Sequence, residues 1–340
     1  MTSLSGLFLS CAGRNGRIRI GRHLGPWGPD ADRGRHVTTD TVPARWRVLV
    51  VLTSAFAVAL PALPADATSV ATSVATSVAA AATGPAPVPR PAAVSHPQQD
   101  HAGSTIPAHE TANGQRPSGR LAPAGVPGLD ASSWQGNVDW GAVYANGGRF
   151  AYVKATESTT YRSPYFAQHY NGSAGTGLIR GAYHFALPDR SSGTAQADYF
   201  VDNGGGWSND GLTLPPMLDI EYDPYGATCY GLSQAAMVLW IRAFSDRIRA
   251  RTTRYPIIYT TTNWWTSCTG NNATFAAANA LFVARYNTTV GTLPAGWAAY
   301  TMWQYANAGT FPGDQDTFNG ATAQLTAFAK GSAPPPPPPA

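Results

Sequence analysis

Residues 216–221 read Pro-Met-Leu-Asp-Ile-Glu, residues 233–251 read SQAAMVLWIRAFSDRIRAR, and residues 255–260 read Tyr-Pro-Ile-Ile-Tyr-Thr. The first and third stretches are short and apolar, which is typical of buried strands. In the middle stretch the apolar residues fall at helical spacing, and Ser233 is a good N-cap. The helical positions are Met237, Trp240, Ile241, Phe244 and Ile248. A strand, a helix and a strand in this order predict two parallel strands that are covered by the helix.

The same alternation continues on both sides. Further strands are predicted at residues 128–130, 150–155, 178–185, 281–286 and 300–305, with a weak eighth near 315–318. Further helices are predicted at 138–145, 163–173, 191–201 and 273–280. Eight strands with about five helices after the first five predict an α/β fold, an irregular TIM-like (β/α)5(β)3 barrel. A doubly wound open sheet is the alternative, although no Gly-x-Gly-x-x-Gly follows a strand.

Composition divides the chain near residue 127. Of ten Trp residues only Trp27 and Trp46 precede this point. Residues 1–127 carry 11 Arg and 6 acids, whereas residues 128–340 carry 12 basic and 13 acidic residues. The positive net charge therefore lies in the leader, and the predicted barrel gives no basic face for nucleic acid. We expect one catalytic domain, a barrel over residues 127–330.

The first 67 residues have the pattern of an N-terminal extension followed by a secretory signal peptide. Arg45 and Arg47 precede a short apolar run at 48–60, and Ala65-Asp66-Ala67 fits a cleavage site near Ala67. The run is too short for a membrane span, and a buried helix is its alternative reading. Residues 68–126 are predicted to be a disordered Ala/Pro/Ser/Thr-rich linker, and residues 331–340 a Pro-rich tail. We expect a secreted protein, extracellular or associated with the cell wall.

Cysteine usage fits export. Cys11 lies in the leader, so Cys229 and Cys268 are the pair left after cleavage, and we expect them to form a disulfide. A metal site would need further ligands, and His169 and His184 are not spaced for one. His184 is interpreted as a hydrogen-bonded structural residue. The sequence implies no metal and no cofactor.

The chemistry is predicted in the stretch Met217-Leu-Asp-Ile-Glu221. Because alternate residues of a strand share a face, Asp219 and Glu221 point the same way, with backbones roughly 6.6 Å apart. Two adjacent carboxylates cannot both ionise freely, so one keeps its proton to higher pH. A carboxylic acid beside a carboxylate is what glycoside hydrolysis requires. An ion pair, or a calcium site with Asp223, is the alternative.

Two more acids and a set of aromatic residues end predicted strands. Asp130 ends the first strand and Asp316 the last, and barrel closure would bring both near Asp219. The alternative for Asp130 is a helix cap. Sugars stack on aromatic faces, so aromatics at strand ends favour a carbohydrate site, although each alone could be a core residue. They are Tyr183, Tyr222, Tyr259, Trp264, Trp265, Tyr286, Trp303 and Tyr305.

Together these motifs resemble glycoside hydrolase family 25, the N,O-diacetylmuramidase type of lysozyme. The matching pieces run in the family's order over residues 127–330. They are Gly-Leu-Asp130-Ala-Ser-Ser-Trp-Gln135, Phe-Ala-Tyr-Val-Lys154-Ala-Thr-Glu157, Gly-Ala-Tyr183-His-Phe185, Leu-Asp219-Ile-Glu221, Ile-Ile-Tyr259, Ala-Arg-Tyr286, Met-Trp303-Gln304-Tyr305 and Asp316. The last strand departs from the family's pattern, because it carries two acids, Asp314 and Asp316, where one is usual.

The resemblance implies an eight-stranded irregular barrel that cleaves the β-1,4 bond between N-acetylmuramic acid and N-acetylglucosamine in bacterial peptidoglycan. It makes Glu221 the general acid and Asp219 the partner of the substrate's N-acetyl group. Asp130 and Asp316 would support the site, and Tyr183, Tyr259, Tyr286, Trp303 and Gln304 would bind substrate. Retention by substrate assistance is favoured, with inversion by activated water as the alternative. A wall-binding module without catalysis and a hydrolase of another acetylated glycan such as chitin remain alternatives. A monomer that contacts neither nucleic acid nor membrane is the default.

Overall fold

The structure is a computed structural model that describes residues 96–110 and 123–332. The predicted extension, signal peptide and cleavage site, most of the predicted linker and most of the Pro-rich tail lie outside these residues. Everything described below belongs to one unit of the chain, within residues 83–340.

Eight strands form a closed barrel, which confirms the predicted fold class. Strand β1 pairs with both β2 and β9, and this pairing closes the ring. A ninth short strand, β3 (Tyr161–Arg162), pairs with the end of β2 outside the ring. The barrel strands are β1 (Val126–Ala131), β2 (Phe150–Glu157), β4 (Ile179–Phe185), β5 (Met217–Asp219), β6 (Ile257–Thr260), β7 (Leu281–Ala284), β8 (Met302–Ala306) and β9 (Asp314–Phe318).

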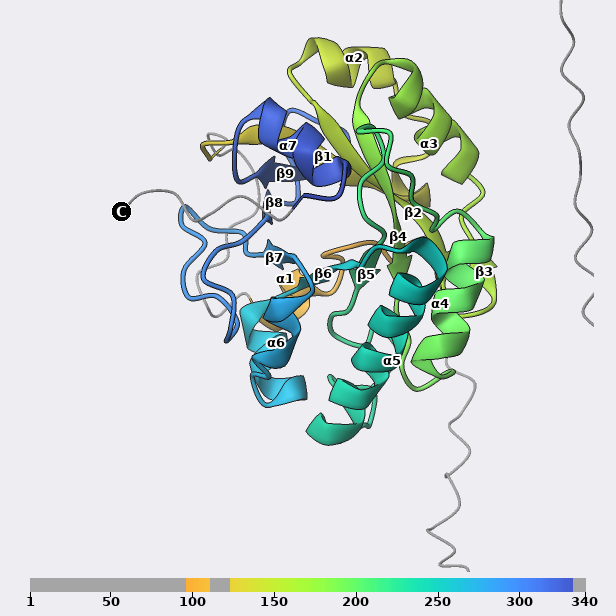
Figure 1. The fold of residues 1–340 in the computed structure, drawn as a ribbon, viewed down its shortest axis with the longest axis vertical. Helices are drawn as coiled ribbons and strands as arrows, with labels where there is room; N and C mark the ends of the chain where they lie inside the picture. The colour runs from red at the N-terminus through yellow and green to blue at the C-terminus, as the bar shows by residue number, and fades with distance from the viewer. Residues whose placement is uncertain (1–95, 111–122, 333–340) are drawn as a thin grey trace, which may run out of the picture. The chain divides into compact units, whose positions relative to one another are not determined.

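One helix follows each of the first five barrel strands, and Figure 1 shows these helices outside the strands. Strands β7, β8 and β9 then follow one another without an intervening helix. The five helices are α2 (Trp140–Ala145), α3 (Phe166–Gly175), α4 (Gly193–Asp202), α5 (Gln234–Thr252) and α6 (Thr262–Thr269). The predicted helix at 273–280 is only a 3-10 turn, η3 (Thr274–Ala277), because α6 already fills the place after β6. A second such turn, η2 (Ser133–Gln135), follows β1.

Helix α5 shows why the central unit folds as predicted. The Ser233 side chain accepts a hydrogen bond from the backbone N–H of Ala236, which satisfies one of the free donors at the helix start. All five apolar positions predicted for this helix are buried. The helix ends where Thr253 takes a left-handed conformation with φ of 63°.

The direction of the last strand differs from that of the others. The barrel strands β1, β2 and β4 to β8 run parallel around the ring, whereas β9 runs antiparallel to both of its neighbours. The start of β9 therefore lies level with the carboxyl ends of the other strands. This reversal decides which acid of the last strand reaches the rim.

The barrel interior is one apolar cluster that is covered at both ends. Its middle includes Tyr152, Met217 and Phe282. At the amino end it takes in Leu325 and Phe328 from α7 (Thr322–Ala329). At the carboxyl end it takes in Ala102 and Ile106 from residues 96–110, the second at the start of helix α1 (Ile106–Glu110). Side chains that point outward from the strands pack in three further clusters, two under the surrounding helices and one under the connection between β7 and β8.

Residues 96–110 differ from the disordered linker that was expected over 68–126. Their composition is polar, with Ile106 as the one large aliphatic residue. In the structure they are ordered by contacts with the barrel, which sequence periodicity does not register.

The predicted disulfide between Cys229 and Cys268 is confirmed, with a Cα–Cα distance of 5.3 Å. It joins the connection between β5 and α5 to helix α6. None of the helices in residues 96–110 and 123–332 has the length and hydropathy needed to cross a bilayer.

Candidate active site

Asp219 and Glu221 meet on the inner side of the barrel at the carboxyl end of β5, as the alternation predicted. Leu218 precedes Asp219, and Ile220 lies between the two acids. Both pack outward in another apolar cluster. The backbone N–H of Ile220 donates to the Tyr259 carbonyl at 3.0 Å, so the chain stays extended beyond Asp219. Both carboxyl groups are buried.

The surroundings of these two acids favour their protonated forms. Burial, opposed by hydrogen bonds from Thr105 and Gly103, raises the pKa of Glu221 to about 8. Burial and then the charge of Glu221 raise the pKa of Asp219 well above its usual range. No other described residue gives the Asp219 carboxyl oxygens a hydrogen bond. A carboxyl that keeps its proton near neutral pH can act as a general acid.

Gln304 on β8 connects a second group of acids. Its amide nitrogen donates to Asp130 at 2.7 Å and to Asp314 at 2.9 Å. Its amide oxygen accepts from Tyr259 at 2.7 Å and from Tyr286 at 3.0 Å. Burial raises the pKa of Asp130 to about 7. The Gln304 side chain therefore holds two tyrosines and two further acids in place beside Asp219 and Glu221.

The last strand brings Asp314, rather than Asp316, level with Asp130. Asp130 pairs with Asp314 in the ladder between β1 and β9, whereas Asp316 pairs with Gly128 two residues deeper. A Cβ at Gly313 would come within 1.9 Å of the Asp130 carbonyl oxygen, so only glycine lets the strands approach here. Asp316 is buried, and no described residue gives its carboxyl oxygens a hydrogen bond. Burial, then Asp130 and Asp314, raise its pKa well above the usual range.

The predicted substrate-binding aromatics divide into two groups. Tyr183, Tyr259 and Tyr286 lie in the interior cluster beneath the acids. Trp303 lies in a different cluster, on the face of β8 opposite Gln304, and its indole N–H donates to the Arg285 carbonyl at 2.8 Å. Alternation along Met302, Trp303 and Gln304 indicates this placement from sequence, because neighbouring residues of a strand face opposite sides.

His184 has the structural role that was expected of it. Its two ring nitrogens lie 2.8 Å from the Thr156 hydroxyl and 2.9 Å from the Gln196 amide oxygen. Burial lowers its pKa to about 3, so it stays neutral.

Residues 96–110 cover this end of the barrel. The backbone N–H of Gly103 donates to Glu221 Oε1 at 2.8 Å, and the Thr105 hydroxyl donates to Glu221 Oε2 at 2.5 Å. No motif in the sequence signalled these contacts, or those of Trp134 and Tyr222 with this segment.

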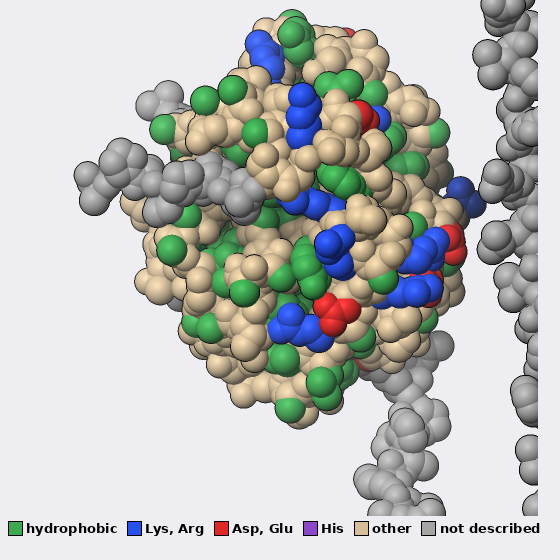
Figure 2. All heavy atoms as spheres, viewed as in Figure 1, with side chains coloured by type: hydrophobic (Ala, Val, Ile, Leu, Met, Phe, Trp, Pro, Cys, Tyr) green, Lys and Arg blue, Asp and Glu red, His purple; other side chains and the backbone are tan. Residues whose placement is uncertain are grey.

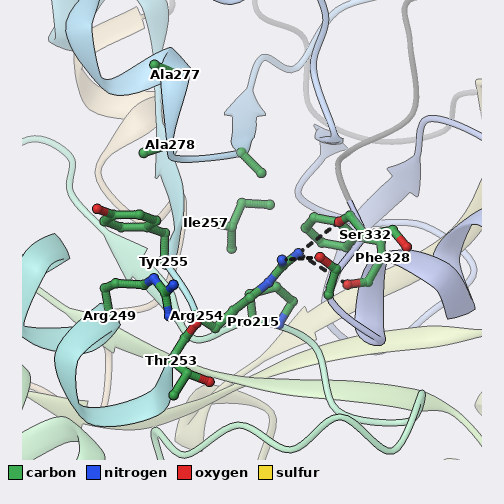
Figure 3. Close-up of a pocket in the computed structure, with 12 residues that line it drawn as sticks. Pro215, Arg249, Thr253, Arg254, Tyr255, Ile257, Ala277, Ala278, Phe328 and Ser332 are labelled. Atoms are coloured by element: carbon green, nitrogen blue, oxygen red, sulfur yellow. Dashed lines mark hydrogen bonds between the residues drawn. The ribbon is translucent and has the colours of Figure 1, made fainter.

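The other end of the barrel has a hollow of about 380 Å³ without comparable chemistry. Figure 3 shows Arg254 reaching across it toward Phe328 and Ser332, where its guanidinium binds backbone carbonyls.

Residues 96–110 and 123–332 contain no group of three His, Cys, Asp or Glu side chains arranged to hold a metal ion. Figure 2 shows basic side chains scattered over one face, several beside acids, which matches the ion pairs of Arg247 and Arg251 with Asp198.

A TIM-like barrel with a buried pair of acids of raised pKa at the carboxyl ends of its strands is the arrangement expected of a glycoside hydrolase. The family profile described as glycosyl hydrolases family 25 matches residues 129–314. The chain therefore belongs to glycosyl hydrolases family 25.

Three relatives support this membership. An N,O-diacetylmuramidase of Arthroderma benhamiae is 53% identical over 206 residues, which are 61% of this chain and 87% of that protein. Lysozyme M1 of Streptomyces globisporus is 48% identical over 224 residues, 64% of this chain and 76% of its own length. The crystal structure of a bacterial lysozyme from Streptomyces coelicolor is similar with a TM-score of 0.61 and 48% identity, and the match covers 62% of this chain and all of that one.

Proposed function

We propose that this glycoside hydrolase is a secreted muramidase that cleaves the β-1,4 bond between N-acetylmuramic acid and N-acetylglucosamine in bacterial peptidoglycan. The observation that carries the proposal is the pair Asp219 and Glu221, which share the inner face at the end of β5 with raised pKa values. The names of the relatives, N,O-diacetylmuramidase and lysozyme, supply the substrate.

In the proposed mechanism Glu221 donates its proton to the glycosidic oxygen as the bond to the anomeric carbon breaks. The carbonyl oxygen of the substrate's own N-acetyl group forms a bond to that carbon on the opposite face. Asp219, ionised while Glu221 holds the proton of the pair, accepts a hydrogen bond from the amide N–H and stabilises the positive charge that develops there. Water then adds to the anomeric carbon as the bond from that carbon to the acetyl oxygen breaks, which regenerates the N-acetyl group. The Glu221 carboxylate takes the water's proton, so the acid is restored and the configuration is retained.

The remaining residues hold this arrangement. Asp130, Gln304 and Asp314 form the hydrogen-bonded group beside the pair, and Asp316 adds a buried acid beneath them. Tyr183, Tyr259 and Tyr286 are proposed to contact the bound sugars. Trp303 is left out of the proposed site, because it lies on the outer face of β8. The disulfide and the predicted signal peptide support secretion.

The test compares two insoluble substrates, peptidoglycan and chitin. We expect the barrel, residues 123–340, to release muropeptides that end in reducing muramic acid, and to release little from chitin. Mass spectrometry of the products identifies the bond. Equal or greater release from chitin would show that the substrate is another acetylated glycan rather than peptidoglycan.

A second outcome would contradict an enzymatic function. Binding of the folded protein to wall sacculi without any release of reducing ends would favour a wall-binding module. The Asp246→Asn variant is a matched control for acid substitutions, because Asp246 is an exposed acid on α5.

A further inference from the structure

Residues 96–110, here called the cleft segment, engage the acid of the proposed mechanism directly. Gly103 and Thr105 donate to the two different oxygens of the Glu221 carboxyl group. Two donors on one carboxyl favour its charged form and occupy both of its oxygens. A glycosidic oxygen that must receive a proton from Glu221 cannot reach it in this arrangement.

The cleft segment is inserted into the barrel rather than laid across its surface. Ala102 and Ile106 are fully buried in the cluster that also holds Tyr183, Tyr259 and Tyr286. The Tyr183 hydroxyl accepts from the Ala102 N–H at 3.3 Å, and Gln304 donates to the Ala102 carbonyl at 3.0 Å. These are the same side chains that are proposed to contact substrate.

Polar contacts hold both flanks of the segment. Lys154 donates to the backbone carbonyls of Pro97 at 3.0 Å and Asp100 at 2.7 Å. The Tyr225 hydroxyl donates to the Asp100 carboxylate. At the far end Glu110 accepts from the Tyr222 hydroxyl at 2.8 Å and from Asn263 at 3.1 Å.

Imidazole rings of the segment stack on two aromatic side chains of the barrel, one of which, Trp134, keeps 61% of its surface exposed. His101 stacks on Trp134 with ring centres 6.0 Å apart, and His109 stacks on Tyr222 at 4.2 Å. Aromatic faces of this kind bind sugar rings by the same stacking. The segment and a glycan chain therefore compete for the acid, the tyrosines and the aromatic faces together.

We propose that residues 96–110 are an inhibitory prosegment that keeps the enzyme inactive while it occupies the cleft. The inference rests on the proposed function. Because the segment is part of the same chain, it is held near the cleft at an effective concentration on the order of millimolar, and a free peptide of the same sequence would have to reach a similar concentration to replace it.

Gly103 is the position at which the segment can be dislodged without changing the barrel. Its φ is +90°, a conformation that side chains disfavour. A Cβ there would lie 2.2 Å from the Tyr286 hydroxyl and 2.6 Å from Gln304 Oε1. Gly103→Val therefore cannot keep the segment in its place. Ala108→Val is the matched control, because Ala108 is exposed on α1.

The first experiment measures reducing-end release from peptidoglycan by the chain from residue 68 and its two variants. Hydrogen exchange over residues 96–110 is recorded in parallel. We expect Gly103→Val to lose protection in the segment and to work at least about tenfold faster, whereas Ala108→Val matches the unsubstituted chain. An unchanged rate in folded Gly103→Val would overturn the proposal.

The second experiment supplies the segment in trans to the barrel, residues 123–340. The Streptomyces coelicolor lysozyme is matched over its whole length by 62% of this chain, about the share of residues 123–332, so a chain of this length forms the fold alone. A synthetic peptide of residues 96–110 should raise KM and leave kcat unchanged, and the Gly103→Val peptide should not. No inhibition at about 1 mM peptide would overturn the proposal.

The two proposals fail in different ways. A folded barrel that releases nothing from peptidoglycan, with or without peptide, contradicts the muramidase function. A barrel that is active but no faster than the chain from residue 68 contradicts the prosegment alone. Direct titration of the peptide into the barrel, followed by calorimetry, measures occupancy of the cleft independently of any activity.

Discussion

The two ends of the barrel are covered in different ways. At the amino end α7 contributes Leu325, Phe328 and Ala329 to the interior cluster. At the carboxyl end the cleft segment contributes Ala102 and Ile106, and many of its remaining contacts are hydrogen bonds to Glu221 or to tyrosine side chains. An apolar cover is part of the folded core, whereas a polar cover over buried acids occupies a binding site. We infer that the cover formed by α7 is needed for folding, whereas the cleft segment must leave before substrate can bind.

The largest expected effect contrasts one apolar side chain at each end. Phe328→Ala should destabilise the barrel by about 3–5 kcal/mol, because it opens a cavity in the core. Ile106→Ala can cost no more than the docking free energy of the segment, since the barrel stays folded once the segment has left. Urea unfolding of both variants measures the difference. Equal losses of stability would show that the segment is an integral part of the fold.

The disulfide sharpens the comparison at the carboxyl end. It pins the connection after Glu221 to α6, while no bond of this kind holds the cleft segment. Reduction should lower the stability by about 2–4 kcal/mol, since the bridge closes a loop of 39 residues. Thermal melting with and without reductant checks this, with an expected drop of roughly 4–16 °C. An unchanged melting temperature would contradict it.

Replacing the buried acid Asp316 should give a smaller change, an increase in the free energy of unfolding. Its folded pKa is raised, so folding takes up a proton and stability falls as pH rises from the unfolded pKa toward the folded one. Asp316→Asn removes this cost and should stabilise the protein by roughly 1–3 kcal/mol at pH 7 and by less at pH 5. Denaturant titrations at the two pH values decide this, and a gain that does not depend on pH would contradict it.

The pH dependence of the uncovered barrel tests the state of Glu221. The acid must be protonated to act, and burial raises its pKa, with a smaller contribution from the charge of Asp130, which stays in the barrel when the segment is absent. The rate should therefore fall about tenfold for each pH unit above a pKa that exceeds the ordinary value near 4.5. Initial rates of the 123–340 barrel across pH 4 to 9 measure this limb. A limb at the ordinary glutamate value would contradict the raised pKa.

The sequence predicts the barrel and the central pair well, for physical reasons. Near-continuous apolar strands alternate with helices such as α5, and the two-residue spacing places Asp219 and Glu221 on one face whatever the surroundings. The direction of β9 depends on long-range pairing, so Asp314 was not distinguished from Asp316 at the rim. Trp303 was included for its type, although alternation places it on the outer face.

The cleft segment was not predictable from periodicity. Its composition is that of a linker, and it is ordered by hydrogen bonds to side chains more than 50 residues away in sequence, such as Lys154 and Glu221. These contacts form only in the folded barrel, so they leave no local pattern in the sequence.

The most direct test of the account compares the 123–340 barrel with its Glu221→Gln variant on purified peptidoglycan, with mass spectrometry of the products. We expect the unsubstituted barrel to yield fragments that end in reducing muramic acid. Glu221→Gln should keep the fold and lose a factor of about 100 to 10,000 in rate, because the proton for the leaving group is missing. A folded Glu221→Gln barrel that releases the same products at an undiminished rate would contradict the central claim.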